Sequence, residues 1–186
     1  NPLKSGFEVV SVMETQKDSS WNAVWGENSV IENNYNQLDI QLQEKNGLKR
    51  KLNLSFKVYN DGMGFRYEIP KQKNIDSILI TQELTEFNFS KNHKGWYTPA
   101  NFDSYEMLFQ NAPLNEIESA NTPITFESDN QVFVSIHEAN LTDYADMTLL
   151  ENKDKEFSFQ SNLVPWPDGV KVKRKAPMVS PWRTIQ

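Results

Sequence analysis

Alternation of apolar and polar residues runs through much of the chain and predicts β-strands. Leu38, Ile40 and Leu42 alternate with polar residues, which is the pattern of a strand with one face in water. The clearest hairpin joins alternating runs over 52–58 and 65–69 through Asn60-Asp61-Gly62, whose residues tolerate positive φ. Further strands are expected at 77–81, 86–89, 131–137, 147–151, 156–160 and 170–173. Short strands at this spacing predict an all-β sandwich or barrel with antiparallel sheets.

The segment 92–125 interrupts this alternation. It carries Pro99, Pro113 and Pro123 and shows little regular periodicity, so it is predicted to be a long irregular connection, with a short helix near 104–109 as the only helical candidate. Residues 177–185 look like the entry to another strand, although the sequence stops one residue later. A strand cut off at a sheet edge would leave unpaired backbone groups, which favours a fragment of a longer polypeptide.

Length and composition bound the domain count and the partners. At 186 residues and 21.6 kDa, the chain is predicted to form a single β-sandwich domain over residues 1–186. A net charge of -6 and a pI near 5.0 give no basic footprint for nucleic acid. The absence of cysteine excludes disulfides, zinc-thiolate sites and thiol nucleophiles. No apolar run approaches the roughly 20 residues of a membrane span, and the first residues lack an apolar signal region, so a soluble domain is expected.

One carboxylate occupies a position where strand alternation calls for an apolar side chain. Val132, Val134 and Ile136 share one face of the strand expected at 131–137, and Glu138 continues their parity. Either the strand leaves the core at Glu138, or a partner binds the carboxylate. His137 has the opposite parity, so the two side chains diverge and are not expected to bind one metal ion.

The other candidate residues have ordinary readings beside the functional ones. His93 lies in a polar turn without a nucleophile motif and is interpreted as a loop histidine, while His137 is either an exposed strand histidine or a ligand contact. Glu83 and Glu86 are expected to be solvated. Asp143 and Asp146 follow Glu138 and could add oxygen donors to a calcium site, but the EF-hand order of ligands is absent.

Aromatic side chains offer a second kind of site. Tryptophan and tyrosine faces stack on sugar rings, although they also fill cores with large apolar area. Trp96 and Tyr97 lie in the irregular segment and are the best candidates for an exposed, substrate-binding role. Trp166 is a further candidate platform. No residues mark a catalytic pair or a phosphate-binding loop.

A set of motifs in a fixed order resembles the N-terminal domain of glycoside hydrolase family 97, which includes bacterial α-glucosidases and α-galactosidases. The motifs are Val24-Trp25-Gly26-Glu27, Tyr35-Asn36-Gln37-Leu38, the run from Tyr59 to Glu68 (YNDGMGFRYE), His137-Glu138-Ala139 and the run from Ser180 to Ile185 (SPWRTI). The resemblance implies a β-super-sandwich of the galactose mutarotase-like kind, which precedes a catalytic TIM-type barrel absent here. It also implies that strands before the first motif are missing. This departure leaves homodimerisation through open sheet edges as an open alternative.

The resemblance also implies a role for this domain. The catalytic carboxylates of the family belong to the barrel, so this chain is expected to hydrolyse nothing alone, while its parent enzyme cleaves α-glycosidic bonds in the periplasm or outside the cell. The glutamate of the family's His-Glu-Ala motif, here Glu138, lends oxygen to a calcium ion shared with the barrel. In the isolated domain, Glu138 is therefore expected at a solvent-facing rim and calcium binding is expected to be weak. The alternatives are an independent carbohydrate-binding sandwich and a purely structural domain.

Overall fold

The computed structural model describes residues 2–73, 75–129 and 131–186, and this part of the chain is almost entirely β-structure. The chain divides into two compact units, Asn1–Ile75 with Ala176–Ser180 and Asp76–Lys175 with Pro181–Gln186. The prediction of a single domain stays a prediction. Among the described residues, no helix has the length and apolar composition that a membrane crossing requires.

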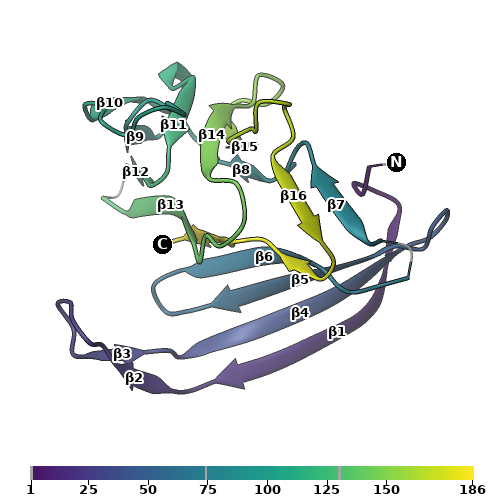
Figure 1. Cartoon of the computed structure of the whole chain (residues 1–186). Coiled ribbons are helices and arrows are strands. Elements are labelled where there is room, and N and C mark those ends of the chain that lie inside the picture. Colours follow the sequence, from purple (N-terminus) through teal and green to yellow (C-terminus); the bar gives the residue numbers. More distant parts are fainter. Residues whose placement is uncertain (1, 74, 130) are drawn as a thin grey trace. The chain divides into compact units, whose positions relative to one another are not determined.

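The first unit is built on one antiparallel meander of long strands (Figure 1). Its order is β1-β4-β5-β6, with β17 paired to β6, and a separate hairpin joins β2 to β3. The strands are β1 (Phe7–Lys17), β2 (Ser20–Asn22), β3 (Val30–Glu32), β4 (Tyr35–Glu44), β5 (Lys51–Val58), β6 (Met63–Ile69) and β17 (Met178–Val179). The predicted hairpin over 52–69 is confirmed as β5 and β6, where Phe56 faces Phe65 in the ladder and their rings stack 5.9 Å apart.

The second unit is a sandwich of two antiparallel sheets with a small third sheet. One sheet has the order β18-β13-β12-β9-β10, the second β11-β14-β15-β8, and the third pairs β16 with β7. The strands are β7 (Ser77–Ile80), β8 (Glu86–Asn88), β9 (Lys94–Tyr97), β10 (Gln110–Pro113), β11 (Ser119–Asn121), β12 (Ile124–Glu127), β13 (Phe133–Ala139), β14 (Met147–Glu151), β15 (Ser158–Leu163), β16 (Val172–Lys175) and β18 (Trp182–Ile185).

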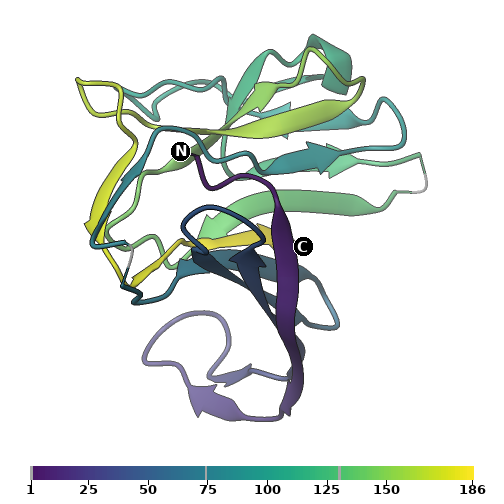
Figure 2. The same cartoon turned by 90° about the vertical axis from the view of Figure 1, so that its right-hand side faces the viewer.

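Apolar side chains from both large sheets of the second unit meet between them. The ring of Phe126 on β12 lies 5.8 Å from that of Phe159 on β15 and 4.5 Å from that of Phe89. Ile124, Ile136 and many of their neighbours are almost completely buried. Figure 2 shows the strands of this unit, coloured teal to yellow-green, in two layers. The prediction of an all-β sandwich with antiparallel sheets is therefore confirmed.

The prediction of an irregular connection over 92–125 is correct for residues 98–109, which form no helix or strand, and wrong for most of the rest of the segment. It contains β9, β10 and β11, begins β12 and includes a single 3-10 turn, η1 (Leu114–Glu116). The helix expected at 104–109 does not form, and these residues belong to the irregular connection between β9 and β10. Strands of three or four residues are too short to display a period, and the pairing partners rather than the local pattern determine them.

Candidate functional site

Arg183 is the centre of a buried charge cluster in the second unit. It lies on β18 directly opposite Glu138 on β13, so both side chains project from the same face of the ladder. Arg183 is completely buried and Glu138 is 6 % exposed. Their Nη1 and Oε2 atoms lie 2.5 Å apart. The carboxylate that breaks the apolar parity of its strand is thus paired with a guanidinium on the neighbouring strand.

A second glutamate holds the other side of the guanidinium. Arg183 donates from Nε to Glu83 Oε1 at 2.8 Å and from Nη2 to Glu83 Oε2 at 2.7 Å. Thr85 and Tyr144 donate their hydroxyl groups to the same carboxylate at 2.9 and 3.0 Å. The two parallel hydrogen bonds from Arg183 to Glu83 are the strongest form of arginine-carboxylate pairing. Burial lowers the pKa of Arg183, but the hydrogen bonds and charge of Glu83 outweigh it and raise the pKa above its usual value.

Glu138 also touches the connection between β13 and β14. Its Oε1 accepts the backbone N–H of Met147 at 2.9 Å. Asp146, which precedes Met147 in this connection, accepts the hydroxyl of Tyr105 on Oδ2 at 2.7 Å. Burial raises the pKa of Glu138 to about 7, and Asp146 contributes in the same direction. The hydrogen bond to Asp146 raises the pKa of Tyr105 to about 12.

These contacts correct two expectations. Glu138 does not lie at a solvent-facing rim, and its partner within the chain is Arg183. The expectation that Glu83 is solvated is also wrong, because its side chain is 6 % exposed and binds Arg183. A signal for Arg183 was present in the sequence. Pro181, Arg183 and Ile185 share one parity, so a positive charge breaks the inward face of one strand as Glu138 breaks that of another.

The oxygen donors of the cluster fit part of a calcium site. Each oxygen of Glu138 accepts one hydrogen bond, which leaves further lone pairs on both, and Asp146 contributes to the raised pKa of this carboxyl. Calcium takes about six to eight oxygen ligands. Within the described residues, no group of three or more His, Cys, Asp or Glu side chains is arranged to hold a metal ion. The described residues therefore supply only part of such a ligand set.

The predicted substrate-binding residues occupy different environments. Trp96 on β9 is 43 % exposed, with the Lys94 ammonium 5.1 Å from its ring centre. Tyr97 is 7 % exposed and donates its hydroxyl to Gln110, a placement that suits the core. His137 is exposed and has the parity of Ser135, which lies in one cross-strand row with Thr125 and Trp96. Trp96 and His137 therefore share the outer face of this sheet, while Tyr97 and Glu138 face the other way.

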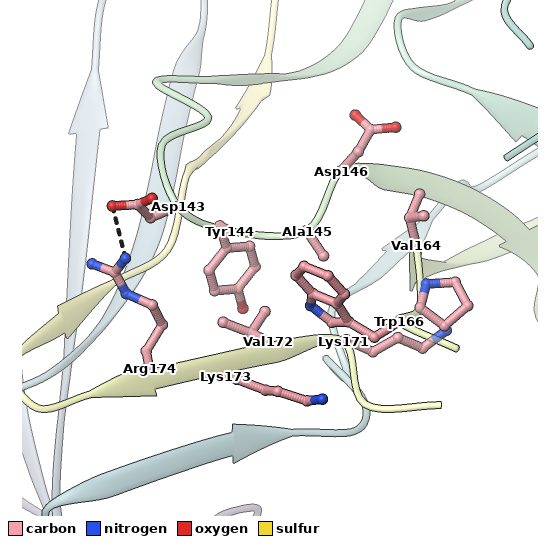
Figure 3. Close-up of a pocket in the computed structure, with 11 residues that line it drawn as sticks. Asp143, Tyr144, Ala145, Asp146, Val164, Trp166, Lys171, Val172, Lys173 and Arg174 are labelled. Atoms are coloured by element: carbon pink, nitrogen blue, oxygen red, sulfur yellow. Dashed lines mark ion pairs between the residues drawn. The ribbon is translucent and has the colours of Figure 1, made fainter. Parts of the chain in front are cut away.

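An open pocket of about 420 Å³ adjoins the Glu138 strand and was not predicted. Its walls come from the connection between β13 and β14, the residues after β15, and β16. Figure 3 shows the rings of Trp166 and Tyr144 next to each other, with the ion pair between Asp143 and Arg174 at one end. Asp146 is also part of the lining, but its carboxylate points away from these rings (Figure 3).

Comparisons with known proteins identify the family. The model of the family described as glycosyl-hydrolase 97 N-terminal matches residues 2–186. The chain therefore belongs to glycoside hydrolase family 97, as a stretch that corresponds to the N-terminal part of its members.

Solved structures agree with this assignment. A family 97 enzyme from Pseudoalteromonas sp. strain K8, in complex with acarbose, matches the whole chain with 35 % identity and a TM-score of 0.94. A variant of the same enzyme in complex with panose gives the same values. In both cases this chain spans 28 % of the enzyme's length. A β-arabinopyranosidase at 20 % identity, with a TM-score of 0.84 over 97 % of this chain, shares the fold.

Proposed function

We propose that this chain is a noncatalytic N-terminal domain of an exo-acting α-glycosidase, an α-glucosidase or an α-galactosidase. In this role it packs on a catalytic TIM-type barrel of the same polypeptide and lends Glu138 to a calcium ion at the active site. The family membership supports the first part, and the length of the family relative, of which this chain spans 28 %, supports the presence of a separate catalytic region. Acarbose and panose, which the relative binds, support an α-linked oligosaccharide as substrate.

The observation that carries the calcium role is the buried carboxyl of Glu138, whose pKa burial and Asp146 both raise. Glu83 and Glu138 both bind the single guanidinium of Arg183, and Asp146 acts on the Glu138 carboxyl. When all three are ionised, the cluster has an excess of negative charge in a poorly solvated place, and an added cation would relieve it. A bound calcium ion supplies a positive charge that can polarise a substrate oxygen and link the two regions of the enzyme. Glu138 and Asp146 are the residues of this chain that would reach it.

The experiment compares Glu138→Gln with Glu86→Gln in the complete enzyme that contains this domain. Glu86 is an exposed glutamate paired with Lys155, so its variant controls for the loss of one carboxylate. After removal of metal by a chelator, calcium is added back while α-glucoside and α-galactoside hydrolysis is followed. We expect Glu138→Gln to need at least about tenfold more calcium than the control. Equal calcium dependence of the two variants would reject the role of Glu138.

Two further properties belong to this proposal. By family resemblance, the enzyme works in the periplasm or is secreted.

The chain can also form a homodimer through β1, because β1 pairs only with β4 among the described residues and exposes Val9, Val12 and Met13. A register shift between Val9 and Ser11 interrupts this edge and limits the pairing stretch to its C-terminal part. Sedimentation equilibrium of the wild type and of Met13→Lys would test the dimer, which the lysine should weaken.

A further inference from the structure

The Trp166 pocket has the features of a binding site for a small polar molecule. Its volume of about 420 Å³ lies within the range of roughly 300–1,000 Å³ that is typical of ligand pockets. Trp166 is 58 % exposed, and hydrogen bonds of its own backbone hold the loop around it. Its backbone N–H donates to Val170 and its carbonyl accepts from Gly169, both at 2.8 Å. The loop thus holds a large aromatic face open to solvent at the pocket.

The apolar part of the pocket lies beside that aromatic face. Val172 on β16 is almost fully buried, and it lines the pocket together with the Tyr144 ring and the Trp166 indole (Figure 3). Tyr144 donates its hydroxyl to Glu83, and its ring faces the Arg183 guanidinium at 5.7 Å, so its position is fixed by the buried charge cluster. A ligand would therefore meet preorganised rings, which lowers the entropy lost on binding.

The polar end of the pocket is formed by an ion pair between Arg174 and Asp143. Arg174 Nη1 and Asp143 Oδ2 lie 2.7 Å apart, and both side chains remain partly exposed. The guanidinium keeps unused N–H donors and the carboxylate keeps unused lone pairs. Two neighbouring hydroxyl groups of one ligand could each bond to one partner of this pair, one as acceptor from Arg174 and one as donor to Asp143.

The charges around the pocket balance, which favours a neutral ligand over an anion. Asp143 and Asp146 oppose Lys171, Lys173 and Arg174, and the Lys173 ammonium is also paired with Asp168 at 2.6 Å. Each acidic or basic group can be matched by one of opposite sign. An anionic ligand would disturb this balance, whereas a neutral polyhydroxylated ring would not.

We propose that the Trp166 pocket binds one pyranose unit of a neutral oligosaccharide, stacked on Trp166 and hydrogen-bonded to Asp143 and Arg174. A pyranose has an apolar face of C–H groups and a rim of hydroxyl groups, so it matches an indole face beside an ion pair with free donors and acceptors. The proposal goes beyond the calcium role of Glu138 and does not require metal at that residue.

The test follows the tryptophan indole N–H signals of the 186-residue chain by ¹H–¹⁵N NMR during titration with panose. Trp166→Phe identifies the signal of Trp166, and we expect panose to shift it saturably. Trp166→Ala should weaken binding at least about tenfold, and Asp143→Asn, which keeps the fold and the indole, should weaken it severalfold. Trp96→Ala is the matched control, because Trp96 is also exposed beside a lysine ammonium but is not part of the pocket lining. It should bind as the wild type does.

Any of the following results would overturn the proposal. Panose could leave the Trp166 signal unmoved, or Trp96→Ala rather than Trp166→Ala could abolish binding. Inorganic phosphate could shift the Trp166 signal while panose does not, which would make the pocket an anion site. A metal chelator separates this proposal from the calcium role. It should leave panose binding unchanged, and loss of panose binding in the presence of the chelator with retention in Asp143→Asn would also reject the sugar pocket.

Discussion

Arg183 and Glu138 are direct cross-strand neighbours, and a 2.5 Å contact joins their side chains within a fully buried part of the second unit. The same guanidinium binds Glu83 through two further hydrogen bonds. Desolvation of three charged groups is unfavourable unless each retains its partners. The stability of the second unit should therefore depend on the completeness of this cluster more than on any surface ion pair.

Arg183→Met should destabilise the chain by about 3–5 kcal/mol, because it leaves two buried carboxylates without a cation. Arg174→Met is the comparison, since the Arg174 and Asp143 side chains are 38 % and 65 % exposed and such a pair contributes at most about 1 kcal/mol. Denaturant unfolding followed by tryptophan fluorescence gives both values. A loss at Arg183 no greater than that at Arg174 would show that the buried cluster contributes little.

The two glutamates on Arg183 should differ in their contributions. Glu83→Gln loses a two-bond charge pair with a buried guanidinium and should cost about 3 kcal/mol. Glu138→Gln should cost less than about 1 kcal/mol, because burial and the neighbouring Asp146 already disfavour its ionised form. The free energies of unfolding are to be compared in the presence of a metal chelator at neutral pH. Equal losses for both variants would contradict the asymmetric geometry around Arg183.

Strand parity predicted part of this site but not its partner. Glu138 stood out because it continued the face of Ile136, and the structure places it on that inward face. Its pairing with Arg183 depends on which strands become neighbours, and a single sequence contains no register between strands that are 45 residues apart. Glu83 was missed because it lies in a loop, which gives no periodic signal.

The fold was predictable where strands are long and their turns are marked. The hairpin of β5 and β6 has both a sustained alternation and an Asn-Asp-Gly turn, so its limits were found closely. The strands β9 to β12 have three or four residues each, and Pro113 and Gly95 lie within two of them. Such strands form because their partners and the core require them, and their composition alone argued for a loop.

Gly95→Ala tests whether packing against the core determines the short strand β9. A Cβ at this position would lie 2.5 Å from Cδ1 of Ile117 and 3.4 Å from Cε1 of Phe126, and both of these side chains are almost fully buried. Overpacking of this kind costs about 1–3 kcal/mol. Thermal unfolding should show a lower midpoint for Gly95→Ala than for the wild type. The double variant Gly95→Ala with Ile117→Val, which shortens the side chain in contact, should cost less than the sum of the two single changes.

Glu44 and Arg50 should control part of the acid stability of the first unit. The hydrogen bond from Arg50 lowers the pKa of Glu44 to about 2, and Arg50 donates from Nε at 2.9 Å across the turn between β4 and β5. A carboxyl with a lowered folded-state pKa contributes stability that is fully present above its unfolded value of 4.5 and is lost as the pH falls through about 2. Denaturant midpoints between pH 6 and 2 should therefore fall less steeply for Glu44→Gln than for the wild type. Glu14→Gln, at an exposed position on β1, should follow the wild-type slope, and parallel slopes for all three proteins would rule out this role of Glu44.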